Sequence, residues 1–151
     1  MKYRRNVGLG EALASQMVEF LRSLQWNVDV MIPVPLSSKR LKERGYNQVA
    51  LVAQPLAYYT GLAYAPQALW KSRDTRSQVG LNVSQRRENV QNAYQADPEI
   101  VRWKSILLMD DVATTGSTIS SSTEALMSAG ARDVYAITIA RALPHHSLNR
   151  V

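Results

Sequence analysis

The fold is decided by one stretch of sequence, Ile106-Leu107-Leu108-Met109-Asp110-Asp111-Val112-Ala113-Thr114-Thr115-Gly116-Ser117-Thr118. Its apolar first half predicts a buried core strand over residues 105–109, followed at once by two adjacent carboxylates. A turn rich in hydroxyl groups comes next, and helical periodicity over 117–129 predicts a helix that ends at Gly130. A strand that ends in paired acids and leads into a helix N-terminus is suited to holding a phosphorylated sugar.

The turn supplies groups that bind phosphate. A helix start offers unpaired backbone N–H groups and the positive end of the helix dipole. Hydroxyl side chains add donors, and glycine lets the backbone come close to a ligand. Asp110 and Asp111 supply acceptors for sugar hydroxyls or for a hard cation such as Mg²⁺. The competing interpretation is a buried strand followed by an acidic turn that only caps the helix.

The rest of the chain alternates strands with helices. Helices are predicted over 9–25 and 46–59, strands over 28–34 and 134–140, and short extended pieces near 68–70 and 94. This order predicts an α/β fold with a mainly parallel central sheet and helices on both faces. Ligands of such sheets bind outside the carboxyl ends of the strands, where the two acids and the turn at 33–35 lie. We expect one domain over 1–151, with its core at about 9–141.

Composition narrows the class of protein. The chain has 151 residues, 46% of them hydrophobic, and no cysteine, which excludes disulfides, thiolate zinc sites and Cys nucleophiles. No apolar run approaches the ~18–20 residues of a membrane helix, and no secretory leader is evident, so we expect a cytoplasmic protein with no membrane partner. A net charge of +6 favours anionic partners, either a phosphorylated substrate or nucleic acid.

Two further segments carry candidate binding residues. The first follows the strand at 28–34 and offers Leu36, Ser37, Ser38, Arg40 and Arg44, among which the arginines can bind a pyrophosphate in a bidentate manner. Its alternative interpretation is a solvated basic helix face. The second is the polar segment 71–81, which reads as a long exposed loop and contains Lys71, Arg73, Thr75 and Gln78.

These motifs resemble those of a known superfamily. Residues 106–118 match the phosphoribosyl-pyrophosphate (PRPP) motif of type I phosphoribosyltransferases at every defined position. The runs Pro33-Val34-Pro35-Leu36 and Arg40-Leu41-Lys42-Glu43-Arg44-Gly45-Tyr46-Asn47-Gln48 resemble the competence-associated, ComF/GntX-like branch of that superfamily. The resemblance covers nearly the whole chain.

The resemblance implies a role for each segment. Asp110 and Asp111 would contact the ribose hydroxyls, and the 5′-phosphate would lie on the turn formed by Ala113, Thr114, Thr115, Gly116, Ser117 and Thr118. Residues 36–44 would bind pyrophosphate, and 71–81 would be the mobile catalytic loop. Arg73 of this loop would be a catalytic residue, together with the two acids. Mg²⁺ would be held mainly through PRPP, with Asp110 or Asp111 as its protein ligand.

The expected reaction is transfer of a 5-phosphoribosyl group from PRPP to an unidentified nitrogen acceptor, with release of pyrophosphate. Two alternatives stay open: a non-catalytic module that senses PRPP or a nucleotide, and a DNA-handling protein in competence that binds nucleic acid weakly.

Proteins of the resembled branch commonly carry a four-cysteine zinc module before this domain. Because the chain has no cysteine, we expect no zinc. The fold is also compatible with a homodimer.

Overall fold

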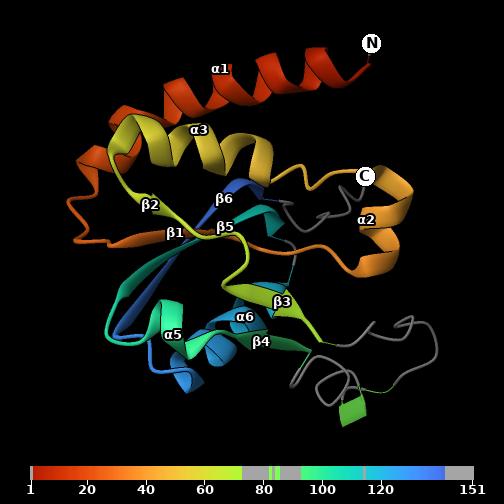
Figure 1. The fold of residues 1–151 in the computed structure, drawn as a ribbon, viewed down its shortest axis with the longest axis vertical. Helices are drawn as coiled ribbons and strands as arrows, with labels where there is room; N and C mark the ends of the chain where they lie inside the picture. Colours follow the sequence, from red (N-terminus) through yellow and green to blue (C-terminus); the bar gives the residue numbers. More distant parts are fainter. Residues whose placement is uncertain (1, 73–81, 83, 86–92, 114, 142–151) are drawn as a thin grey trace, which may run out of the picture.

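The central sheet is parallel, as predicted. The computed structural model describes residues 2–72, 82, 84–85, 93–113 and 115–141. Over these residues, four parallel strands lie in the order β2-β1-β5-β6 (Figure 1). Their bounds are β1 Val30–Pro33, β2 Ala63–Tyr64, β5 Ser105–Ala113 and β6 Asp133–Arg141.

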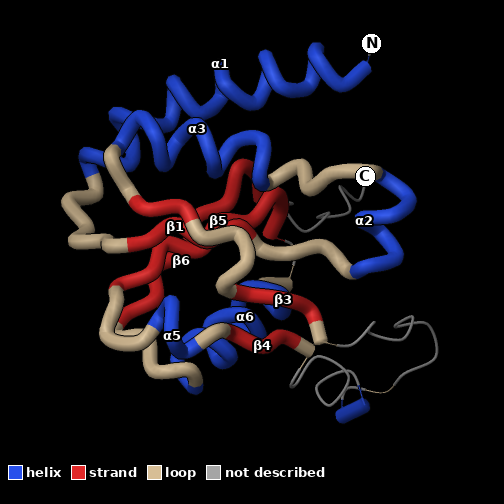
Figure 2. The backbone as a smooth tube through the Cα atoms, in the orientation of Figure 1, coloured by secondary structure: helices blue, strands red, loops and turns tan. Residues whose placement is uncertain are grey.

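Helices cover both faces of this sheet, which confirms the predicted fold class. One face carries α1 (Lys2–Ser23) and α3 (Ala50–Thr60). The other face carries α5 (Pro98–Val101), α6 (Ser117–Ser128) and an antiparallel hairpin of β3 (Leu69–Lys71) and β4 (Tyr94–Ala96) (Figure 2). The short helix α2 (Ser38–Arg44) lies to one side of these layers (Figure 1). None of the described helices is long and apolar enough to cross a membrane.

Side chains of β5 alternate between two separate cores. Leu107 and Met109 pack into the cluster under α1 and α3, whereas Ile106 and Leu108 pack into the cluster with α6 and the hairpin. All four side chains are fully buried. Successive strand residues point to opposite faces, so a strand covered on both faces reads as one continuous apolar run.

Two predicted boundaries are wrong for reasons that concern the site. The strand predicted to end at Met109 continues to Ala113, because β6 pairs with it beyond the acids, at Val112↔Ala140 and Ala113↔Arg141. The helix predicted from residue 46 begins at Ala50. The Asn47 side chain instead ties this segment to the turn after β1, donating to the Val34 carbonyl at 2.9 Å and accepting from the Val49 N–H at 3.1 Å.

The order of the strands determines where the sheet can bind a ligand. The connection through α3 carries the chain from β1 outward to β2, and the connection through α6 carries it from β5 outward to β6 in the opposite direction. The switch therefore falls between β1 and β5, which pair from Val30↔Ile106 to Pro33↔Met109. A crevice at the carboxyl ends of such a strand pair is where open α/β sheets bind their ligands.

Candidate functional site

A cleft of about 210 Å³ lies beyond the carboxyl ends of β1 and β5. It is lined by the turn after β1, by α2, by residues 47–49, by the hairpin residues Lys71 and Tyr94, and by Asp110, Asp111, Val112 and Thr118. The structure thus brings segments of the chain more than 60 residues apart to one place. Of the predicted pyrophosphate residues, Leu36, Ser37, Arg40 and Arg44 line the cleft, whereas Ser38 is exposed and does not.

Helix α2 presents two arginines to the cleft. Its start is capped by Ser37, whose hydroxyl accepts from the Arg40 N–H at 3.2 Å. Its end is set by Gly45, whose φ of +80° favours glycine and lets its N–H bond to the Leu41 carbonyl. Residues four apart share one helix face, so Arg40 and Arg44 point to the same side. Most of the segment predicted to bind pyrophosphate is therefore a short helix whose two arginines line the cleft.

Hydrogen bonds within the chain orient both acids at the end of β5. Asp110 Oδ1 accepts from the Asp111 N–H at 2.8 Å, and Asp111 Oδ1 accepts from the Val112 N–H at 2.7 Å. Asp110 is only 8% exposed. Burial raises the pKa of Asp110 from 3.8 to about 6; the bond from the Asp111 N–H opposes this rise, and the Asp111 charge adds to it. The pair therefore combines one buried carboxyl with one more accessible carboxyl.

The turn after β5 leads into the N-terminus of α6. Gly116 has a φ of +77°, a left-handed conformation that side chains other than glycine seldom adopt. The hydroxyls of Thr115 and Ser117 lie 3.0 Å apart. A hollow of about 20 Å³ is formed by this turn with Asp110, Val112, Ala113, Ser117, Thr118 and Ile119. It has room for about one water molecule, so a phosphate would have to sit at its mouth.

Tyr94 is a site residue that the sequence did not single out. Antiparallel pairing places it opposite Lys71, whose Nζ lies 5.7 Å from the centre of the tyrosine ring. Burial raises the pKa of the Tyr94 hydroxyl, the charge of Asp110 adds to the rise, and a hydrogen bond with Thr118 opposes it. The tyrosine thus links the hairpin to α6 and to the acids. In the sequence, its only signal was an aromatic residue starting a short extended piece.

The remaining predicted loop residues cannot be compared with the structure. Arg73, Thr75, Gln78 and Thr114 all lie outside the described residues. The two strands that flank residues 73–92 are anchored beside the cleft, since the Ser72 N–H donates to the Ala93 carbonyl at 2.7 Å. Lys71, which was predicted to lie in the exposed loop at 71–81, instead ends strand β3 and lines the cleft.

The oxygen ligands in the cleft can be compared with those that the predicted Mg²⁺ ion requires. Among the described residues there is no group of three or more His, Cys, Asp and Glu side chains that could hold a metal ion. The cleft offers two carboxylates, from Asp110 and Asp111. Mg²⁺ commonly binds through one or two protein carboxylates together with substrate phosphates and water, so this donor set fits a magnesium ion that arrives with a phosphorylated ligand.

Solved structures with the same architecture define the class of fold. One is the glutamine PRPP amidotransferase from B. subtilis, complexed with ADP and GMP (24% identity, TM-score 0.56, 89% of this chain and 26% of that one). Another is the adenine phosphoribosyltransferase from Thermoanaerobacter pseudethanolicus (16% identity, TM-score 0.52, 84% and 67%). The chain has the type I phosphoribosyltransferase fold.

Sequence relatives define the branch. The chain is 31% identical over 148 residues to the DNA utilization protein YhgH of Salmonella typhimurium, covering 95% of this chain and 65% of the relative. It is 32% identical over 116 residues to competence protein F of Haemophilus influenzae, covering 76% and 51%. No family model matches the sequence. The chain is thus similar in sequence to ComF-like proteins, the branch that its motifs resemble, and it spans about half to two thirds of the length of these relatives.

Proposed function

We propose that the chain binds PRPP across the cleft and transfers its phosphoribosyl group to a nitrogen acceptor, releasing pyrophosphate. One observation carries the proposal. Asp110, Asp111 and the start of α6 line the same cleft as Arg40 and Arg44 of α2. Such a cleft suits a ligand that is anionic at both ends and carries hydroxyl groups between them.

Each group in the cleft would have a distinct role. The carboxylates of Asp110 and Asp111 would accept hydrogen bonds from the two ribose hydroxyls, which also orients the sugar. The 5′-phosphate would lie at the mouth of the turn and accept from the backbone N–H groups at the start of α6. Arg40 and Arg44 would face the pyrophosphate group. Each guanidinium is positively charged and can donate two parallel hydrogen bonds to the phosphate oxygens.

The reaction requires charge stabilisation rather than a protein nucleophile. The bond between sugar C1 and a pyrophosphate oxygen breaks, a bond between C1 and the acceptor nitrogen forms, and the nitrogen loses a proton. Positive charge develops on the sugar, beside the carboxylates, and negative charge develops on the leaving group, beside the arginines. Bound Mg²⁺ would neutralise part of the pyrophosphate charge, with Asp110 or Asp111 as its protein ligand.

Calorimetric titration with PRPP and Mg²⁺ tests the site. Wild type should bind, and Asp111→Asn should lose at least tenfold in affinity. Glu124→Gln, the same chemical change on an exposed position of α6 outside the cleft, should leave affinity unchanged. Absence of binding by wild type, or equal binding by Asp111→Asn, would reject PRPP as the ligand. A pyrophosphate-release screen with purine, pyrimidine and amine acceptors then separates a transferase from a module that only senses PRPP.

A second candidate function is DNA handling, favoured by the basic surface of α2. Lys39, Arg40, Lys42 and Arg44 are all exposed on this seven-residue helix, and two relatives are named for DNA utilization and competence. Lys39 and Lys42 do not line the cleft. If α2 contacts single-stranded DNA, Lys39→Gln/Lys42→Gln should lower the slope of log affinity against log salt by about 1.4 while PRPP binding is kept. An unchanged slope would exclude α2 from a DNA interface.

A further inference from the structure

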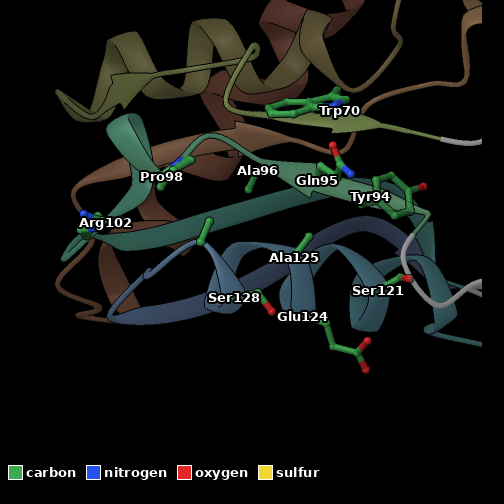
Figure 3. Close-up of a pocket in the computed structure, with 11 residues that line it drawn as sticks. Trp70, Tyr94, Gln95, Ala96, Pro98, Arg102, Ser121, Glu124, Ala125 and Ser128 are labelled. Atoms are coloured by element: carbon green, nitrogen blue, oxygen red, sulfur yellow. The ribbon is translucent and has the colours of Figure 1, made fainter.

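A second and larger cavity lies on the hairpin side of the sheet. This groove has a volume of about 490 Å³ and runs between the β3–β4 hairpin and α6, from Tyr94 to Arg102 (Figure 3). Trp70 of β3 lies along one side, and Ser121, Ala125 and Ser128 of α6 lie along the other. Tyr94 lines both the groove and the cleft, so the two cavities share this residue.

The walls of the groove suit a planar ring. Trp70 is 42% exposed, which leaves part of a large aromatic surface open to the groove. Aromatic side chains favour stacking with other flat rings, and stacking on a nucleic-acid base contributes about 1–3 kcal/mol. Apolar surface from Ala96, Pro98 and Ala125 continues the contact, while Gln95 and Ser128 supply hydrogen-bond donors and acceptors. Small-molecule sites combine apolar walls with a few polar groups in this way.

The groove and the cleft differ in the charge of the residues that line them. The groove has one cation, Arg102, and one anion, Glu124, so its lining has no net formal charge. The cleft instead gathers Arg40, Arg44 and Lys71 around its two acids. A phosphorylated ligand is therefore favoured by the cleft and gains nothing from the groove. The volume also lies within the ~300–1,000 Å³ range of small-molecule sites.

We propose that this groove is a second ligand site, for an uncharged nucleobase or nucleoside stacked on Trp70. The polar edge of the ring would bond to Gln95 and Ser128, and the α6 side would close over its other face. This site goes beyond the proposed function, because it requires neither PRPP nor the acids of the cleft.

Titration of the wild-type chain with adenosine, inosine and uridine tests the proposal. Saturable binding is expected by calorimetry, with quenching of tryptophan fluorescence. Trp70→Phe should lose most of that quenching, because Trp26 and Trp103 do not line the groove. The absence of saturable binding of any of the three nucleosides would overturn the proposal.

Two variants locate the site. Trp70→Ala removes the stacking surface and should weaken binding at least tenfold. Ser128→Phe fills the groove from an exposed position of α6, so it should block binding while the fold is kept, as circular dichroism would check. The control is Tyr58→Ala, which removes an aromatic side chain 83% exposed on α3, away from the groove. Equal binding by Ser128→Phe and wild type would place the ligand elsewhere.

The test also separates other outcomes. PRPP titration of the same variants reports on the cleft independently, so failure of PRPP binding and failure of nucleoside binding are distinguishable. If sedimentation shows a dimer that Ser128→Phe dissociates, the groove is a contact between copies and the proposal is overturned.

Discussion

Replacing Asp110 by Asn should stabilise the folded chain at neutral pH. The carboxyl is 8% exposed, and burial raises its pKa from 3.8 to about 6, so the folded state disfavours the ionised form. The hydrogen bond from the Asp111 N–H can be kept, because the Asn side chain retains a carbonyl oxygen that accepts it. The substitution therefore removes the cost of a buried charge while keeping the local geometry.

The size of the effect follows from the pKa. The difference between 3.8 and about 6, at about 1.4 kcal/mol per pH unit, gives an upper value of about 3 kcal/mol. Because Asp110 lines an open cleft, solvent screening reduces this to about 1–2 kcal/mol. For a chain of this size, the corresponding rise in Tm is about 2–8 °C.

The pH dependence has a definite sign. Because the pKa of Asp110 is higher in the folded state, the folded state holds more protons than the unfolded state between pH 3.8 and about 6. The contribution of Asp110 to the free energy of unfolding therefore falls as pH rises from 3.8 to about 6, and it is constant above that range. The advantage of Asp110→Asn should be absent below about pH 4 and complete by about pH 7.

Urea unfolding of both proteins at pH 4, 5.5 and 7.5 measures this advantage. Glu124→Gln makes the same change at an exposed position and should alter the free energy of unfolding by less than about 0.5 kcal/mol. A variant that is less stable than wild type at pH 7.5, or an advantage that is the same at all three pH values, would refute the reasoning. A more stable variant that no longer binds PRPP would indicate that the buried charge is kept for the site at the expense of the fold.

Three other perturbations have expected outcomes. Gly10→Ala would bring a Cβ to 2.5 Å from a carbonyl oxygen of α3, so the free energy of unfolding measured in urea should fall by about 1–3 kcal/mol. Gly8→Ala places its Cβ where no atom lies within 4 Å, so it should stabilise α1 by up to about 1 kcal/mol. Ser105→Ala removes the donor of a 2.9 Å bond to Asp133 Oδ2 at the opposite end of the sheet, so thermal unfolding should show a loss of about 1–2 kcal/mol with PRPP binding unchanged. If ionised Asp110 is the form that binds PRPP, calorimetric affinity should fall about tenfold per pH unit below about pH 6; affinity that is independent of pH from 5 to 7.5 would contradict this role.

Local sequence was sufficient for the features that depend on neighbouring residues. The apolar run at 106–109 specifies a strand buried on both faces, and Gly116 specifies a left-handed turn directly before a helix. These are short-range patterns, since strand alternation and helix starts are encoded within a few residues. They were enough to predict the fold class and the position of the acids at the ligand-binding end of the sheet.

The tertiary structure decided what depends on long-range pairing. Pairing of β5 with β6 extends the strand past the acids, and the surrounding packing buries Asp110, which raises its pKa. Pairing of β3 with β4 brings Tyr94 beside Lys71 at the cleft, and the same hairpin forms the groove with α6. No local pattern encodes these contacts, because they join residues that are more than 20 positions apart. The sequence by itself therefore determined that β5 ends in two carboxylates followed by a glycine turn and a helix start, and only the folded chain decided which side chains surround them and that burial raises the pKa of Asp110.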